Sequence, residues 1–130
     1  MGAVKGRFDS HGQPFLPVEL SGLRGTVTLQ ALVDTGFDGD LCIPLALAMT
    51  IGLELKDADY VELADGSIRR ELIFRGNVRI GDLAPREGEI VLTDSDQPLI
   101  GAGMFEKLKL EIDYGALTVL LKPSRKRSRR

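Results

Sequence analysis

The sequence LQALVDTGFDG, residues 29–39, runs from an apolar strand pattern directly into a polar turn. Residues 25–33 alternate between apolar and polar side chains and include β-branched residues, which is typical of a half-buried strand. A carboxylate is uncommon at the end of such a strand, so Asp34 is the first candidate site residue, together with Thr35 and Gly36 beside it. The alternative for Asp34 is a structural role, because Asp in a turn often accepts a hydrogen bond from a nearby backbone N–H.

A similar order of elements occurs a second time near residue 100. Residues 98–101, PLIG, form another apolar run that ends at glycine, and this copy contains no carboxylate. Each glycine turn is followed by a segment with helical features. These segments are residues 44–51, which start with Pro and stop before Gly52, and residues 102–108, AGMFEKL. We therefore expect one or two short helices.

Period-two patterns dominate the rest of the chain and predict a mainly β fold. The strongest turn signal is Asp65-Gly66, because both residue types tolerate the backbone angles of a tight hairpin turn. It predicts the tip of a long hairpin that runs from about residue 60 to residue 76. The predicted strands are residues 15–20, 25–33, 60–63, 68–80, 88–92, 108–112 and 117–121.

Taken in order, these motifs resemble those of the retropepsin-like aspartic proteases of clan AA. The resemblance is to the single-domain, homodimeric kind, which includes retroviral enzymes and small bacterial and archaeal members, and it covers residues 18–121. It implies a retropepsin-like acid-protease barrel with a flap hairpin, in one domain over residues 1–121. The motifs are ALVDTGFDG at residues 31–39, LADG at 63–66, LIG at 99–101, MF at 104–105 and IDYG at 112–115.

In such a family each subunit brings one Asp to an active site on the two-fold axis of a homodimer, and a flap covers the substrate. The resemblance implies an aspartic endopeptidase that cleaves a peptide or an unstructured protein, with no metal and no cofactor. Its catalytic loop would contain Asp34, Thr35 and Gly36. The implied substrate-binding residues are Phe37 in the same loop and Ala64, Asp65, Gly66 and Ser67 at the flap tip.

Elementary chemistry explains why such an enzyme needs two carboxyl groups. Hydrolysis without a metal or a covalent nucleophile needs one group that accepts a proton from water and another that donates a proton to the carbonyl oxygen. Two adjacent carboxyls that share one proton can do both, because like charges about 3 Å apart do not both ionise cheaply. One such Asp per chain therefore requires two chains.

Two departures from the retroviral pattern leave a second function open. Phe37 stands where retroviral enzymes usually have a small Ala or Ser, and a bulky ring there would crowd the cleft. No Arg follows Gly101. The alternative function is a non-catalytic, protease-like module that binds a peptide or dimerises.

Composition excludes several other classes of protein. The chain has one Cys and one His, which excludes internal disulfides, His-rich metal clusters and most Ser-His or Cys-His hydrolases. Aromatic residues make up 5% of the chain and Trp is absent, so a base-stacking platform for nucleic acid is poorly supported. We interpret Asp38 and Asp40 as solvated loop carboxylates rather than metal ligands, and Cys42 as a small buried hydrophobe.

Basic residues are concentrated at the C-terminal end, where six of the 17 Lys and Arg side chains lie in the last nine positions. Residues 1–121 carry 11 basic and 19 acidic side chains, a net charge of −8. We expect residues 122–130 to form a disordered basic tail, with weak binding to a polyanion as the alternative. Residues 1–15 have no apolar signal-peptide core and no run is long enough to span a bilayer, so the sequence predicts a cytoplasmic protein without membrane contact.

Overall fold

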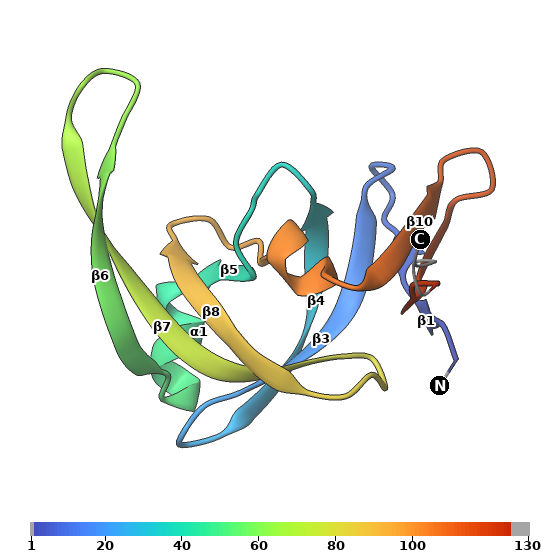
Figure 1. Cartoon of the computed structure of the whole chain (residues 1–130), viewed down its shortest axis with the longest axis horizontal. Helices are drawn as coiled ribbons and strands as arrows, with labels where there is room; N and C mark the ends of the chain where they lie inside the picture. Colours follow the sequence, from blue (N-terminus) through green and yellow to red (C-terminus); the bar gives the residue numbers. More distant parts are fainter. Residues whose placement is uncertain (1, 126–130) are drawn as a thin grey trace, which may run out of the picture.

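The computed structural model describes residues 2–125, and most of this part of the chain forms β-strands (Figure 1). It contains one α-helix, α1 (Leu45–Ile51), and one 3-10 helix, η1 (Ala102–Phe105). The predicted mainly β class with short helices is confirmed. The strands are β1 (Val4–Lys5), β2 (Arg7–Phe8), β3 (Pro14–Ser21), β4 (Thr26–Asp34), β5 (Leu41–Pro44), β6 (Glu54–Glu62), β7 (Ile68–Ile80), β8 (Arg86–Thr93), β9 (Leu99–Gly101), β10 (Leu108–Asp113) and β11 (Thr118–Pro123).

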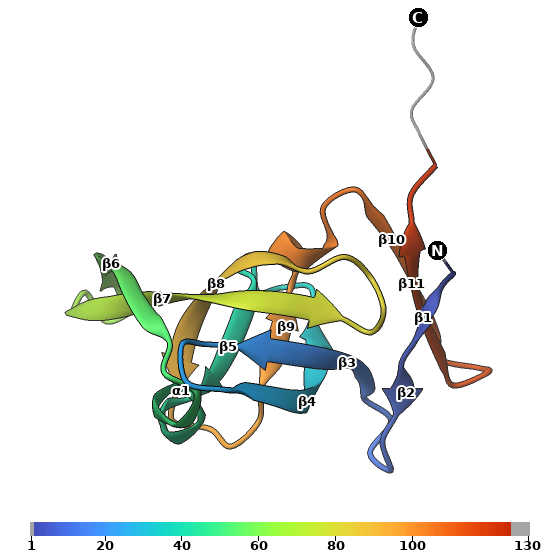
Figure 2. The same ribbon diagram turned by 90° about the horizontal axis from the view of Figure 1, so that it is seen from below.

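The larger sheet has eight strands in the order β2-β3-β4-β9-β5-β8-β7-β6. Because β3 also pairs with β7, the ladder that leaves β3 through β4, β9, β5 and β8 returns to it through β7. The pairs β4–β9 and β5–β8 are parallel, whereas the other pairs are antiparallel. The smaller sheet, in the order β1-β11-β10, lies at one end of the molecule (Figure 2).

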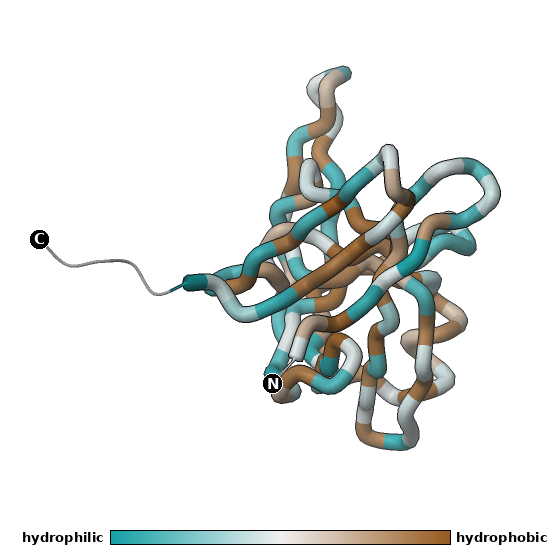
Figure 3. The backbone as a smooth tube through the Cα atoms, turned by 90° about the vertical axis from the view of Figure 1, so that its right-hand side faces the viewer, coloured by the Kyte–Doolittle hydropathy of each residue, from teal (hydrophilic) through white to brown (hydrophobic). Residues whose placement is uncertain are grey.

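The hydrophobic core is formed by the inward faces of these strands. Burial alternates along β3, where Leu16, Val18 and Leu20 are almost fully buried. Apolar and polar residues also alternate along the strands in Figure 3. Burying one large apolar side chain contributes about 1.5–3 kcal/mol, so this core accounts for most of the driving force for folding. Other side chains in the core are Leu41, Ile43, Val78, Ile90, Ile100, Val119 and Leu121.

The first predicted helix agrees with the structure. The sequence predicts residues 44–51, and α1 covers Leu45–Ile51. Gly52 has a φ of 69°, and its N–H donates a hydrogen bond to the carbonyl of Ala48 at 3.1 Å. This left-handed residue ends the helix, as glycine commonly does. No helix among residues 2–125 is both long and apolar enough to cross a bilayer.

The second predicted helix is wrong in its length. The sequence predicts a helix over residues 102–108, but η1 ends at Phe105 and Leu108 begins β10. Lys107 has a φ of 64°, which interrupts any right-handed helix, and Leu108 pairs with Pro123 of β11. Strand pairing therefore overrides the local helical preference.

The β6–β7 hairpin is longer than predicted and has a different turn. Strand β6 begins at Glu54 rather than near residue 60, because it pairs with β7 from Glu54 to Glu62, with one register shift between Leu55 and Asp57. At the tip, Gly66 has a φ of 86° and its N–H donates to the carbonyl of Leu63 at 2.9 Å, while the N–H of Leu63 donates to the carbonyl of Ser67 at 2.8 Å. This is the pattern of a three-residue loop that ends in a left-handed glycine, so only Gly66 needs the unusual backbone angle.

Strand β11 extends two residues beyond residue 121, where the predicted domain ends. Lys122 and Pro123 belong to β11, and the Lys122 Nζ lies 3.3 Å from the Glu111 Oε1 on β10. The ordered strand therefore ends at Pro123. Residues 126–130, which hold most of the predicted basic tail, lie outside the described residues.

Candidate functional site

Asp34 is the last residue of β4, and its neighbour across the parallel pair with β9 is Gly101. The carboxylate is half-buried, whereas Thr35 and Gly36 are exposed. The N–H of Gly36 donates to the Asp34 Oδ1 at 3.1 Å, and the N–H of Phe37 donates to the Asp34 carbonyl at 3.1 Å. The turn thus fixes one carboxylate oxygen of Asp34, as the structural interpretation of this residue predicts.

The loop between β4 and β5, residues 35–40, is held against the β9–η1 segment by main-chain hydrogen bonds. The N–H of Gly101 donates to the carbonyl of Asp40 at 2.9 Å, and the N–H of Gly103 donates to the carbonyl of Gly39 at 3.0 Å. A Cβ on Gly101 would lie 2.3 Å from the carbonyl oxygen of Gly39. The two segments therefore approach backbone to backbone, which only glycine permits.

Phe37 packs on its own loop. A Cβ on Gly39 would lie 2.6 Å from the ring Cζ, and a Cβ on Gly101 would lie 2.6 Å from the ring Cδ2. The ring is half-buried against these two glycines, and the carbonyl of Phe37 accepts a hydrogen bond from the N–H of Ala102 at 2.8 Å. This packing removes the reason to expect a ring that crowds the cleft, while a substrate contact for Phe37 stays a prediction.

Strand register defines a strip of side chains on the same face as Asp34. Leu32 lies two residues before Asp34 on β4 and is paired with Leu99, and Leu99 is paired in turn with Cys42 of β5. Cys42 is next to Val91 of β8. Residues directly opposite one another in a sheet share a face, so these half-buried side chains form a mostly apolar surface beside the carboxylate.

Cys42 is half-buried rather than buried, which corrects the sequence interpretation. Desolvation raises the pKa of its thiol, and a hydrogen bond with Thr93 opposes this effect only in part. The thiol is therefore neutral at physiological pH and contributes to the strip as a small apolar group.

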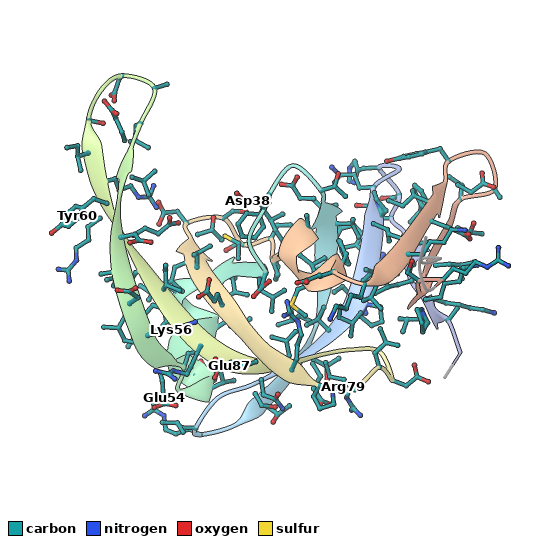
Figure 4. The ribbon with its side chains drawn as sticks, viewed as in Figure 1. Asp38, Glu54, Lys56, Tyr60, Arg79 and Glu87 are labelled. Atoms are coloured by element: carbon teal, nitrogen blue, oxygen red, sulfur yellow. The ribbon has the colours of Figure 1, made fainter. Side chains whose placement is uncertain are left out.

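The structure places four of the predicted site residues together at the end of β4. The other four lie together elsewhere, at a distance from the first group. Asp34 at the end of β4 and residues 35–37 of the β4–β5 loop lie together. Residues 64–67 form the exposed tip of the β6–β7 hairpin, which projects away from the body (Figure 1). Figure 4 shows the same separation, with Asp38 in the loop and Tyr60 on the hairpin. At the tip, hydrogen bonds from the Oγ and N–H of Ser67 lower the pKa of the Asp65 carboxyl.

Asp40 is mostly buried at the end of the β4–β5 loop, so its interpretation as a solvated loop carboxylate is wrong. Its side chain is only 15% exposed, and the Arg86 Nη2 lies 3.0 Å from its Oδ1. The N–H of Glu89 donates to the Oδ2 at 2.8 Å. Because Arg86 lies 46 residues further along the chain, no local pattern links it to Asp40. No group of three or more potential metal-ligating side chains is found within residues 2–125.

No protein-family model matches the chain, and neither does any curated protein sequence. Among solved structures, the chain is similar to a retropepsin-like aspartic protease from Rickettsia conorii, known from its crystal structure. The two chains are 21% identical, the match covers 92% of this chain and 90% of that chain, and the TM-score is 0.64. The chain therefore has a retropepsin-like fold, as the sequence motifs implied.

Proposed function

We propose that the chain is an aspartic endopeptidase that works as a homodimer, with one Asp34 from each copy at the two-fold axis. The observation that carries the proposal is the position of Asp34, at the end of a strand and on a loop fixed by main-chain bonds, within a retropepsin-like fold. A chain with a single such carboxyl supplies half of an acid–base pair. A symmetric dimer supplies the other half.

In the proposed mechanism, the two Asp34 carboxyls share one proton. The ionised carboxylate accepts a proton from water, which attacks the peptide carbonyl, while the protonated carboxyl donates to the carbonyl oxygen. The Gly36 N–H keeps one oxygen of each Asp34 in place through the 3.1 Å hydrogen bond. The exposed hydroxyl of Thr35 would link the loops of the two copies.

The substrate is proposed to be a peptide or an unstructured protein segment bound in an extended conformation. The apolar strip of Leu32, Leu99, Cys42 and Val91 would contact its side chains, and residues 64–67 at the hairpin tip would close over it, with Phe37 beneath. An extended peptide offers backbone groups to a hairpin of this kind at little cost in strain. Weak polyanion binding through the basic tail remains a prediction.

A non-catalytic, protease-like module is the second candidate. The hydrogen bond from Gly36 to Asp34 favours it, because that bond gives the carboxylate a structural role that needs no reaction. The two candidates differ in one measurable property. Only the endopeptidase hydrolyses an unstructured protein such as reduced, carboxymethylated casein, with a rate that depends on Asp34.

Dilution should switch the proposed enzyme off. Below the dissociation constant of the dimer, the concentration of dimer falls with the square of the total concentration, so a tenfold dilution should lower the cleavage rate about a hundredfold. Sedimentation velocity on the same series should show the monomer appearing in parallel. A species that sediments as a monomer and cleaves in strict proportion to its concentration would contradict the homodimer.

Binding of a peptide-like ligand beneath the hairpin should order the hairpin tip. In the free protein the tip makes few tertiary contacts, so we expect rapid amide exchange over residues 61–69, and about tenfold slower exchange with a peptide-like transition-state analogue bound. The turn at residues 114–117, which joins β10 and β11, is a matched control and should not change. Equal exchange at the hairpin tip with and without the analogue would count against its role as a flap.

A further inference from the structure

We propose that Asp40 and Arg86 act as a positioning pair that holds the β4–β5 loop, and with it Asp34, in its working geometry. The effect on catalysis rests on the proposed function, whereas the effect on the loop does not. Asp40 is the last residue before β5, and Arg86 is the first residue of β8. The pair therefore links the C-terminal end of the β4–β5 loop to the start of β8.

The guanidinium of Arg86 bridges three segments through one nitrogen. Its Nη2 lies 3.0 Å from the Asp40 Oδ1, 2.8 Å from the carbonyl oxygen of Gly103 and 3.3 Å from the Met104 Sδ. The second oxygen of Asp40 accepts the N–H of Glu89 at 2.8 Å. Both carboxylate oxygens are thus engaged, and the loop, η1 and β8 meet at this one pair.

The surroundings leave Asp40 little freedom to move. A Cβ on Gly103 would lie 2.4 Å from the Asp40 Oδ1, so this carboxylate packs directly on the η1 backbone. The main-chain bonds from Gly101 and Gly103 join the same two segments. The ion pair therefore reinforces the contact between η1 and the β4–β5 loop, which follows Asp34.

Burial of the carboxylate distinguishes this pair from the Arg79–Glu19 pair. The Asp40 side chain is 15% exposed and that of Glu19 is 38% exposed, whereas the two arginines are about equally exposed, at 45% for Arg86 and 43% for Arg79. Charge-assisted hydrogen bonds are stronger than neutral ones, and removing Arg86 would leave the mostly buried Asp40 carboxylate without its charged partner. Replacing Asp40 would remove the acceptor that ties the loop to Arg86 and to the N–H of Glu89. Either change should therefore shift the loop, and the Arg79–Glu19 pair provides a matched control.

A small shift of the loop would have a large effect on a shared-proton pair. Misplacing a reacting group by about 1 Å can lower the rate about a hundredfold. We therefore expect Asp40→Asn and Arg86→Met to lower kcat by about 10- to 100-fold with a smaller change in KM, because the substrate-binding strip is left intact. Arg86→Lys should recover part of the loss, since Lys keeps the charge and can keep one hydrogen bond.

The test measures loop order and cleavage in the same variants. Amide exchange at Gly101 and Gly103 should be about tenfold faster in Asp40→Asn and Arg86→Met, with the amides of β3 unchanged. The double variant should be no worse than the single variants, because residues that act as a unit are not additive. Glu19→Gln and Arg79→Met should match the wild type within about twofold. In Figure 4 Arg79 lies on the opposite side of the body from Asp38, and Glu19 is its ion-pair partner.

Two results would overturn the proposal. The first is unchanged amide exchange at Gly101 and Gly103 in the Asp40 and Arg86 variants, whether or not the wild type cleaves. The second is faster exchange throughout these variants, β3 included, because the pair would then stabilise the whole protein and not the loop in particular. Faster exchange confined to the loop, with lower kcat, supports both the pair and the protease. Faster loop exchange in a protein that never cleaves supports the pair and counts against the proposed function.

Discussion

Replacing Asp34 with Asn should lower the rate of peptide cleavage by roughly 10²–10⁴-fold, the range that general acid–base catalysis supplies, while the dimer persists. Asn has nearly the size of Asp, and its Oδ1 can still accept the Gly36 N–H that lies 3.1 Å from the carboxylate in the wild type. The loop should therefore keep its shape, and what is lost is the group proposed to activate water. The measurement is cleavage of reduced, carboxymethylated casein, with the dimer mass determined in parallel.

The wild type should show a bell-shaped dependence of kcat/KM on pH. Protonation of both carboxyls removes the base, ionisation of both removes the acid, and each limb belongs to the pair rather than to one Asp34. The melting temperature of Asp34→Asn should equal or exceed that of the wild type, because the variant would no longer bring two like carboxyls together in the proposed dimer.

Asp38→Asn provides the matched control for this substitution. Asp38 is an exposed carboxylate in the same loop, and its removal should change cleavage by less than about twofold. An Asp34→Asn dimer that cleaves as fast as the wild type would refute the mechanism. A wild type that never cleaves but binds peptides would instead favour the non-catalytic module.

Gly101→Ala should lower the free energy of unfolding by about 3 kcal/mol, at the upper end of what overpacking a tight site costs. The new Cβ would lie 2.3 Å from the carbonyl oxygen of Gly39 and 2.6 Å from the carbonyl oxygen of Phe37. Both are backbone atoms, so the loop has to move and the main-chain bonds across it weaken. For a domain of this size the melting temperature should fall by roughly 10 °C.

Gly25→Ala is the matched control for the glycine substitution. A Cβ at Gly25 would meet no atom within 4 Å, so the melting temperature of this variant should stay within about 2 °C of the wild type. Urea unfolding of both variants would measure the difference. If Gly101→Ala were as stable as Gly25→Ala, the loop would be much softer than its contacts indicate.

Strands with a clear local pattern were predictable from the sequence. The predicted strand over residues 68–80 has the bounds of β7, and its apolar residues on either side of Gly76-Asn77 gave the local signal. Pairing with β8 and β3 carries the strand through Gly76 and Asn77 without a turn. Strand β5 was missed because its four residues, LCIP, are too short to show a period. The early part of β6 was missed because its exposed residues, which include Lys56 and Asp57, show no alternation and are recruited by pairing with β7.

The candidate site also has one part that local sequence suggests and another that only the fold brings together. Asp34, Thr35 and Gly36 could be proposed as site residues because the strand, the carboxylate and the turn are adjacent in the sequence. The partner of Asp40 could not be identified, because α1 and the β6–β7 hairpin separate Arg86 from Asp40 along the sequence. The packing of Phe37 on Gly39 and Gly101 likewise depends on which backbones meet in three dimensions.

The glycine contacts beneath the loop also bear on how a gene for such a chain can change over evolutionary time. The loop and the β9–η1 segment meet where Gly39, Gly101 and Gly103 have no side chains, so the geometry around Asp34 is specified by what these positions lack. At core positions of the strands, many apolar residues can replace one another and still fill the core. At Gly39, Gly101 and Gly103 an added Cβ would lie closer than 3.0 Å to another atom, so we expect these positions to tolerate far fewer substitutions than the core strands.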